Sequence, residues 1–433
     1  MSLLIKINKK WYYDKKYFYF CKTNDSITIK MNLRFLQETN PSSRNALLKK
    51  DIVRYYINNG ENSLADLGKE MNLSIPTVTK LVSELIDDGF VVDFGKQETT
   101  GGRRPNIYGL NENSGYFIGV DIRHFSVNIG LINFKGEMID SQMKVPYKIN
   151  QTRESFDELC SIVEGFINST VVPKEKILSI GINISGRINA QAGYSYSFFN
   201  FDEMPVTEIL EKKFGINVSI DNDSRAMAYG EYLKGCIKGE KNILFINVGW
   251  GLGLGIIVNG QLYYGKSGFS GEFGHMAAFD NEVLCHCGKK GCLETEASGS
   301  YIHRLFLEKV NNGYSSRLSK KILKQKEEIT SEDIISAALH EDMLAIELIE
   351  NVGNTLGKHI AGLINLFNPE LVVIGGSLSA AGDYLLLPLR SSIKKYSLNL
   401  VSKDTDIKLS KLGDKTGLIG ACLLARSKII GLI

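Results

Sequence analysis

One short stretch of the sequence carries the residue types that bind a transition metal. His275 is followed by Cys285, Cys287 and Cys292, so four potential ligands lie within eighteen residues. One imidazole nitrogen and three thiolates make the tetrahedral set that Zn²⁺ prefers in a closed structural site. Two glycines between the last two cysteines allow so short a loop to fold back on one ion. The spacing therefore predicts a zinc site.

The same cysteines could instead form a disulfide or be unrelated buried thiols. Cys285 and Cys287 are too close in sequence to pair with each other comfortably. The four remaining cysteines are scattered without a framework, as is usual in a reducing cytosol. His286 lies between two of the predicted ligands, and we expect its side chain to point away from them, outside the site.

Two carboxylates flank this loop. Glu272 lies three residues before His275, and Glu294 lies two residues after Cys292. If one ring nitrogen of His275 binds the metal, the other carries a proton and can donate a hydrogen bond. The folded loop then offers two acceptors and one oriented donor, which suits a polyol.

These motifs resemble the signature of the ROK family, which comprises repressors, open reading frames and sugar kinases. The resemblance rests on G-E-F-G-H from Gly271 and C-x-C-G-x-x-G-C-L-E from Cys285, and it extends from about Gly119 to the C-terminus. It implies an α/β actin-like (ribonuclease H-like) ATPase fold in two lobes. The family's repressors carry a helix-turn-helix domain in front of this fold.

The resemblance also implies sugar ligands on a second segment. Asn222 and Asp223 lie where a predicted strand over 218–221 ends and a helix begins. In the family's kinases the matching aspartate is the general base for a sugar hydroxyl, and the asparagine is a neighbouring sugar ligand. Taken alone, Asp223 could instead be the helix N-cap. Together the predicted sugar-binding residues are Asn222, Asp223, Glu272, His275 and Glu294.

The segments that hold ATP in the family's kinases are altered here. Asp121 is kept, but Ile, Arg, His and Phe follow it where the kinases need glycines and a hydroxyl to admit a phosphate. Trp250 replaces a threonine in the second loop, where glycines alternate over 249–255 along one face of a predicted strand. The third element, 371–377, survives as a strand and a glycine turn. We therefore expect a kinase-like domain that has lost ATP binding and is not an enzyme.

A winged helix-turn-helix domain of α+β type is predicted over residues 41–111. Apolar residues at helical spacing end at Gly60, a second helix covers 64–71, and a third begins at Ser74 and runs through Gly89. In this arrangement the N-terminal residues of the last helix read base edges in the major groove. The predicted contacts are Thr77, Thr79 and Lys80, with Val78, Leu81, Val82 and Leu85 on the buried side.

Two strands and a glycine turn follow and form the predicted wing. Its tip carries Arg103 and Arg104, which suit phosphate or minor-groove contact. The alternative for this unit is a plain dimerisation or packing domain, but the paired arginines would then have little structural purpose.

The charge distribution agrees with this division. Residues 1–111 carry 17 Lys and Arg against 12 Asp and Glu, or +5, which leaves −2 of the net +3 for the rest of the chain. A basic front on a nearly neutral body fits an anionic partner that contacts only the front. Residues 1–40 are an N-terminal extension, whose first thirty residues either lack a function or form a basic arm that helps to hold DNA. Residues 115–433 form the predicted ROK sugar-binding domain.

We expect a cytoplasmic protein with no membrane partner, because no signal peptide is evident. The longest uncharged stretch, 242–265, is too rich in glycine and asparagine for a membrane span. Two other segments are predicted to be structural helices, namely 330–367, capped by Ser331, and 416–430.

The predicted function is that of a sugar-responsive transcriptional repressor. It would bind operator DNA as a homodimer or a dimer of dimers and release it when a monosaccharide or amino sugar binds. Two alternatives stay open, namely a ROK-type ATP-dependent sugar kinase and a sugar-binding module that acts through a protein partner.

Overall fold

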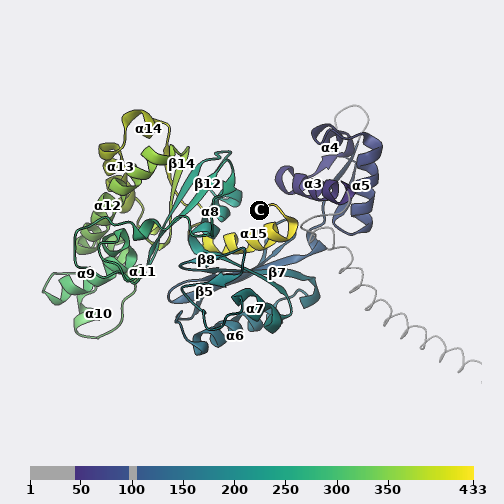
Figure 1. The fold of residues 1–433 in the computed structure, drawn as a ribbon. Coiled ribbons are helices and arrows are strands. Elements are labelled where there is room, and N and C mark those ends of the chain that lie inside the picture. Colours follow the sequence, from purple (N-terminus) through teal and green to yellow (C-terminus); the bar gives the residue numbers. More distant parts are fainter. Residues whose placement is uncertain (1–43, 97–104) are drawn as a thin grey trace, which may run out of the picture.

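The computed structural model describes residues 44–96 and 105–433. Residues 44–96 and 105–110 form three helices and three short strands, and the strands pair antiparallel in the order β1-β3-β2. Figure 1 shows this winged helix-turn-helix unit, the predicted DNA-binding domain, as a compact unit at one end of the protein. Its elements are α3 (Arg44–Asn59), β1 (Asn62–Ser63), α4 (Leu64–Glu70), α5 (Ile75–Asp87), β2 (Val91–Lys96) and β3 (Asn106–Leu110).

The helix-turn-helix follows from its caps and its apolar face. The side chain of Ser63 accepts a hydrogen bond from the N–H of Asp66 at the start of α4, and Ser74 does the same for Thr77 at the start of α5. These caps fix where each helix begins, and therefore which residues α5 presents. The predicted buried side of α5 is confirmed, because Val78, Leu81, Val82 and Leu85 are all at most 1% exposed.

The first lobe of the body is a mixed five-stranded sheet in the order β10-β7-β4-β5-β6. β4 and β7 are parallel neighbours that are buried along their whole length, which explains their almost continuous apolar sequence. Its elements are β4 (Tyr116–Ile122), β5 (Ser126–Asn133), β6 (Met138–Pro146), α6 (Arg153–Ser169), β7 (Ile177–Ile184), β8 (Ile188–Asn189), β9 (Tyr194–Ser195), α7 (Val206–Phe214) and β10 (Asn217–Asn222).

The second lobe contains another five-stranded sheet, in the order β13-β12-β11-β14-β15, with helices packed against it (Figure 1). Its strands are β11 (Ile243–Val248), β12 (Leu252–Val258), β13 (Gln261–Leu262), β14 (Leu371–Gly375) and β15 (Asp406–Leu409). Its helices are α9 (Gly299–Asn311), α10 (Ser319–Leu323), α11 (Ser331–Leu339), α12 (Met343–Phe367), α13 (Asp383–Tyr396) and α14 (Asn399–Lys403).

Two helices lie between the lobes. α8 (Asp223–Lys234) packs on β11 and β12, α15 (Thr416–Ile430) packs on β4 and β7, and the two helices pack on each other. Their close approach needs glycine, since a Cβ atom on Gly420 would lie 2.0 Å from the carbonyl oxygen of Ala226. In Figure 1, α15 runs in yellow from the junction of the lobes towards the DNA-binding domain.

Sequence reasoning placed one long helix incorrectly and another correctly. The predicted helix over 330–367 is two helices, α11 and α12, separated by a turn in which Glu341 has a φ of 64°. Thr330, not Ser331, is the N-cap, because it forms a capping box with Asp333. The predicted helix over 416–430 matches α15. Among the described residues, no helix is long and apolar enough to cross a membrane.

Candidate metal centre and sugar site

Four side chains of the metal loop, residues 271–294, lie around one point. One potential ligand atom from each of His275, Cys285, Cys287 and Cys292 lies within 4.8 Å of the others. The Nδ1 atom of His275 is 3.6 Å from Cys285 Sγ, and the sulfurs of Cys287 and Cys292 are 3.7 Å apart. These separations fit the edges of a tetrahedron with metal–ligand bonds of about 2.0–2.3 Å. The cluster can therefore hold a metal ion, and its sulfurs are too far apart for a disulfide.

The second ring nitrogen of His275 faces a carboxylate. Its Nε2 atom lies 3.7 Å from Glu272 Oε2. If Nδ1 binds the metal, Nε2 carries the proton and is directed towards the predicted sugar site. Burial raises the pKa of Glu272, and the negative charge of Asp223 raises it further, while the charges of His275 and Arg187 act in the opposite sense. Glu272 thus lies beside the ring nitrogen of His275 that would not bind the metal.

His286 lies differently from the expectation that it points away. Its Nδ1 atom is 3.0 Å from Glu294 Oε1 and 3.9 Å from Cys285 Sγ. The hydrogen bond with Glu294 raises the pKa of His286. Cys285, His286 and Glu294 also form a second group of potential metal ligands. The expectation that this ring points away from Cys285 is therefore wrong, because the folded loop brings it beside Glu294, but the group of four potential ligands does not include His286.

Glu294 joins the metal loop to the second lobe. Its Oε2 atom accepts a hydrogen bond of 2.8 Å from the N–H of Leu252 at the start of β12. Burial would raise the pKa of Glu294, but the hydrogen bonds from His286 and Leu252 outweigh burial and lower it. The carboxylate is therefore ionised and fixed in position, and a sugar hydroxyl would share oxygens that already have partners.

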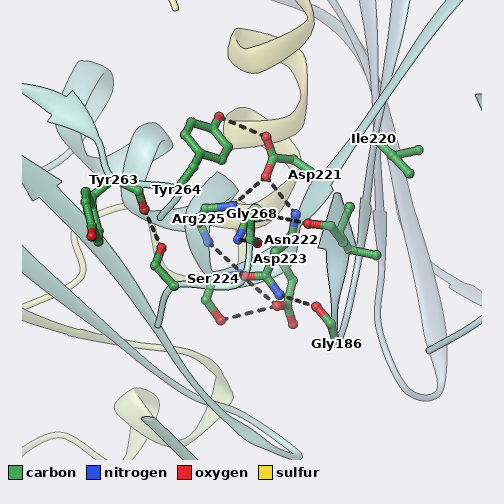
Figure 2. A network of polar contacts seen from close by, with 12 residues as sticks. Gly186, Ile220, Asp221, Asn222, Asp223, Ser224, Arg225, Tyr263, Tyr264 and Gly268 are labelled. Carbon is green, nitrogen blue, oxygen red and sulfur yellow. Dashed lines mark hydrogen bonds and ion pairs between the residues drawn. The ribbon is translucent and has the colours of Figure 1, made fainter. Parts of the chain in front are cut away.

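Asn222 and Asp223 lie where β10 ends and α8 begins (Figure 2). Asn222 is the N-cap of α8, since its Oδ1 accepts from the N–H groups of the first turn, and its Nδ2 donates to the carbonyl of Gly186 at 3.0 Å. Asp223 accepts hydrogen bonds from Ser185 Oγ at 3.0 Å and from the N–H of Ser224 at 2.7 Å. The capping role considered for Asp223 thus belongs to its neighbour. Burial raises the pKa of Asp223.

The Ser185–Arg187 loop completes this side of the site, and its sequence also resembles a sugar element of the family. Gly186 has a φ of 90°, and a Cβ atom there would lie 2.3 Å from Ser197 Oγ, so only glycine fits. This turn directs Ser185 to Asp223 and places Arg187 near enough to Glu272 to lower its pKa. The signal in the sequence was a glycine between two polar residues directly after an apolar strand.

A buried ion-pair network supports the site from behind (Figure 2). Asp221 Oδ1 accepts from Arg225 Nε at 2.8 Å, and Arg225 also donates to the carbonyls of Gly268 and Ile188. Asp221 Oδ2 accepts from the hydroxyl of Tyr264 at 3.1 Å. Arg225 therefore ties together the two loops that carry Arg187 and Glu272. No local pattern in the sequence indicates this pair, because Asp221 lies in β10 and Arg225 in α8.

The network also includes a residue from the end of the chain. Lys428 Nζ, on α15, lies 3.3 Å from Asp221 Oδ2. Burial alone would raise the pKa of Asp221, but the charges of Lys428 and Arg225 outweigh burial and hold that pKa below its ordinary value. Nothing in the local sequence pattern indicates this pairing, since the two residues are separated by most of the body.

Comparison with known proteins identifies the family. The ROK family profile matches residues 117–428, and a winged helix-turn-helix DNA-binding profile matches residues 47–92. The chain belongs to the ROK family. A xylose repressor from Caldicellulosiruptor bescii is 31% identical over 88% of this chain and 95% of its own length. A glucokinase from Halalkalibacterium halodurans is 32% identical, but over 72% of this chain and 96% of its own length.

A solved structure agrees with this assignment. The crystal structure of a ROK family transcriptional regulator, described as a homologue of the Escherichia coli MLC protein, has a TM-score of 0.74 at 28% identity. It covers 89% of this chain and 96% of its own chain. The actin-like fold with a winged helix-turn-helix in front, expected from the sequence, is therefore confirmed.

Aromatic rings join the two lobes at the two loops that match the phosphate-binding loops of ROK kinases. The ring of His124, from the first lobe, stacks on Trp250 of the second lobe with centroids 4.6 Å apart and an angle of 8°. Phe125 meets the edge of the same indole at 5.1 Å. Burial lowers the pKa of His124, with a further contribution from Lys148, so the stacked ring is neutral at physiological pH. Side chains thus occupy the space between these two loops.

Arg123 lies in the same loop as His124 and Phe125 and pairs with two aspartates. Its Nε donates to Asp121 Oδ2 at 3.1 Å, and its Nη1 lies 3.4 Å from Asp414 Oδ1. The aspartate retained from the kinase pattern is therefore paired with a cation of the protein itself. The strand predicted over 249–255 begins later, since β12 starts at Leu252 and the first two glycines lie in a turn.

The DNA-reading residues remain predictions. Thr79 and Lys80 are exposed on α5, while Thr77 is half-buried and its hydroxyl bonds to Ser74 Oγ at 2.8 Å. Ile75, at the N-terminus of the same helix, is 57% exposed, and an apolar side chain in this position can contact a thymine methyl group. Sequence reasoning did not include it. Arg103 and Arg104 lie outside the described residues.

Proposed function

We propose that this ROK protein is a sugar-responsive transcriptional repressor. The observation that carries the proposal is the combination of a winged helix-turn-helix with a ROK body in which Glu272 lies beside His275 and Asp223 accepts a hydrogen bond from Ser185. The xylose repressor and the ROK transcriptional regulator resemble the chain over 88% and 89% of its length, whereas the glucokinase aligns over 72%, a share no larger than the body. The effector is a monosaccharide or amino sugar, whose hydroxyls suit charged acceptors contributing about 1.5–3 kcal/mol each.

The metal in this proposal is zinc, held by His275, Cys285, Cys287 and Cys292. The donor set and its separations fit a closed four-coordinate site, which supplies structure and not Lewis-acid catalysis. The ion would fix the ring of His275 so that Nε2 can donate to a sugar hydroxyl. It would also hold the loop between Glu272 and Glu294 in one conformation.

The DNA partner is an operator with two half-sites. Thr77, Thr79 and Lys80 would contact bases, and Arg103 and Arg104 of the wing would contact phosphate or the minor groove. Two half-sites require two recognition helices, so the working form is a homodimer or a dimer of dimers. Sugar releases DNA only if it binds the DNA-incompetent arrangement more tightly than the competent one.

The decisive experiment replaces Glu272 by glutamine. We expect Glu272→Gln to bind operator DNA as the wild type does but to stay bound when D-xylose, D-glucose or N-acetyl-D-glucosamine is added, in a salt-controlled gel shift. Glu282→Gln is the matched control, because Glu282 is an exposed glutamate of the same loop. A Glu272→Gln variant that no longer binds DNA, or that releases it normally, contradicts the proposal.

The kinase alternative has its own test. Incubation with Mg²⁺, ATP and the same sugars should give no phosphorylated product, because Arg123 and Trp250 occupy the two phosphate loops. Turnover at an ordinary enzymatic rate of about 1–10³ s⁻¹ would favour the kinase. The protein-partner alternative predicts that no duplex DNA is bound at any salt concentration.

A further inference from the structure

The last turn of α15 contacts both the support of the sugar site and the DNA-binding domain. Lys428 lies in this turn and pairs with Asp221, the residue directly before Asn222 and Asp223. Gly431, three residues later, is the C-cap of α15, and its carbonyl oxygen accepts a hydrogen bond from Arg54 Nη2 on α3. One helical turn thus joins the buried network shown in Figure 2 to the first helix of the DNA-binding domain.

We propose that this turn transmits sugar binding to the DNA-binding domain, with Lys428 and Arg54 as the positioning residues at its two ends. This inference rests on the proposed function. A sugar bound by Glu272 acts on the loop that Arg225 holds through the carbonyl of Gly268, and Arg225 also holds the neighbouring loop through the carbonyl of Ile188. Any shift of Arg225 moves the carboxylate of Asp221, to which it is bonded at 2.8 Å.

The turn is a suitable transmitter because Lys428 makes two direct contacts with the end of β10, one of them to the buried Asp221. Lys428 Nζ also donates to the carbonyl of Ile220 at 3.0 Å, so the ammonium is held by both the backbone and the carboxylate of β10. The side chain of Asp221 is 2% exposed, so its ion pair is little screened by solvent. A displacement of β10 therefore moves the end of α15, because Lys428 contacts β10 directly and not through solvent.

A second contact keeps α15 attached to the DNA-binding domain. Arg426 Nη1 donates to the carbonyl of Lys135 at 2.8 Å, in the turn between β5 and β6. Lys135 Nζ lies 3.2 Å from Glu61 Oε1 and 5.0 Å from the centroid of the Phe94 ring, both in the DNA-binding domain. Because Lys135 holds the DNA-binding domain against the body, movement at Gly431 would rotate α3 and would not separate that domain from the body.

The first test removes the charge of Lys428 and keeps its length. In Lys428→Met the carboxylate of Asp221 retains Arg225, Tyr264 and the N–H of Asn222, so the fold should survive. We expect operator affinity without sugar, and sugar affinity without DNA, to stay within about threefold of the wild type. The factor by which sugar weakens operator binding, typically about 5–150-fold in allosteric proteins, should fall towards one. Lys403→Met, on exposed α14, is the matched control.

The second test acts at the other end of the turn. Arg54→Met removes the hydrogen bond to Gly431 and should reduce the sugar response in the same way. Asp51→Asn is its control, because it removes the other partner of Arg54, at 3.0 Å, and leaves the contact with Gly431. If the two positions act in series, the double variant responds no less than either single variant, whereas independent structural defects add.

The measurements are operator Kd by fluorescence anisotropy, on a duplex selected by the purified protein from a random pool, with and without D-xylose, D-glucose and N-acetyl-D-glucosamine. Calorimetry gives the sugar affinity. A full sugar response in both Lys428→Met and Arg54→Met overturns the inference and leaves the proposed function intact. If Lys428→Met does not fold, Arg54→Met decides alone. A wild type that releases DNA with none of these sugars refutes the proposed function itself.

Discussion

Replacing Cys292 by serine should unfold the tip of the metal loop and leave the two lobes folded. Of residues 280–290 only Cys285 is buried, so this tip has no apolar core of its own. Ordering the backbone of roughly a dozen residues costs about 12–24 kcal/mol, at about 1–2 kcal/mol each. A structural zinc ion contributes about 10–16 kcal/mol. The metal is thus the interaction of the right size to order the tip.

The assay uses the exposed Lys289 and Lys290 as reporters. Limited trypsin digestion should cut Cys292→Ser, or the chelated wild type, after these lysines and separate 1–290 from 291–433. The metal-loaded wild type should resist. The main thermal transition should move little, because the core residues of both lobes lie outside the tip, residues 280–290. Cys236→Ser is the control, since Cys236 is a free cysteine after α8 and its loss leaves all four ligands.

Two results would refute this reasoning. One is a purified wild-type protein that carries no stoichiometric metal by elemental analysis. The other is a Cys292→Ser variant whose tip resists trypsin as well as the wild type does. Either would mean that backbone hydrogen bonds such as that from the N–H of Cys285 to the carbonyl of Lys289, 2.8 Å long, suffice to order the tip.

Two further predictions concern the aromatic contacts of Trp250 and the carboxylate of Asp223. Trp250→Ala removes aromatic contacts with His124 and Phe125 that contribute about 0.5–1.5 kcal/mol each beyond burial, so denaturant titration should show a lower free energy of unfolding. The variant should still not phosphorylate sugars, because Arg123 still pairs with Asp121; kinase activity would show that the indole alone blocks ATP. Asp223→Asn should raise the melting temperature at pH 7, since the raised pKa of Asp223 means that folding disfavours its ionised form. This gain in melting temperature should vanish as the pH falls through the pKa of Asp223 and the wild type becomes protonated, and an equal gain at all pH values would contradict the prediction. The same variant should bind sugar about 10–150-fold more weakly, because it loses one charged hydrogen bond.

The fold was predictable because its elements are local patterns. Periodicity and caps gave α5 and α15, and the buried strands gave the layered body. The clustering of His275 with the three cysteines was predictable for the same reason, because all four residues lie on one short segment. The break at 340–342 was missed because the apolar period continues across it, and only the positive φ of Glu341 and the capping box at Thr330 reveal two helices.

The supports of the site were not predictable, because tertiary contacts assign them. Glu294 is held by Leu252, and Asp221 is held by Lys428 from the end of the chain. Charged residues such as these look like ordinary surface residues in the sequence. Their roles appear only when the fold buries them, since a buried carboxylate without a partner would cost several kcal/mol.

The side chains that fill the two phosphate loops affect how a sugar could change the angle between the lobes. In this chain Arg123 and Trp250 fill the space between the loops with side chains of the protein, so closure there needs no nucleotide. A ligand shifts a conformational equilibrium only by its difference in affinity for the two states. The carboxylates of Asp223 and Glu272 come from different lobes, so a sugar that bridges them senses the angle between the lobes directly. Its binding energy can then act on that angle without competing against ATP.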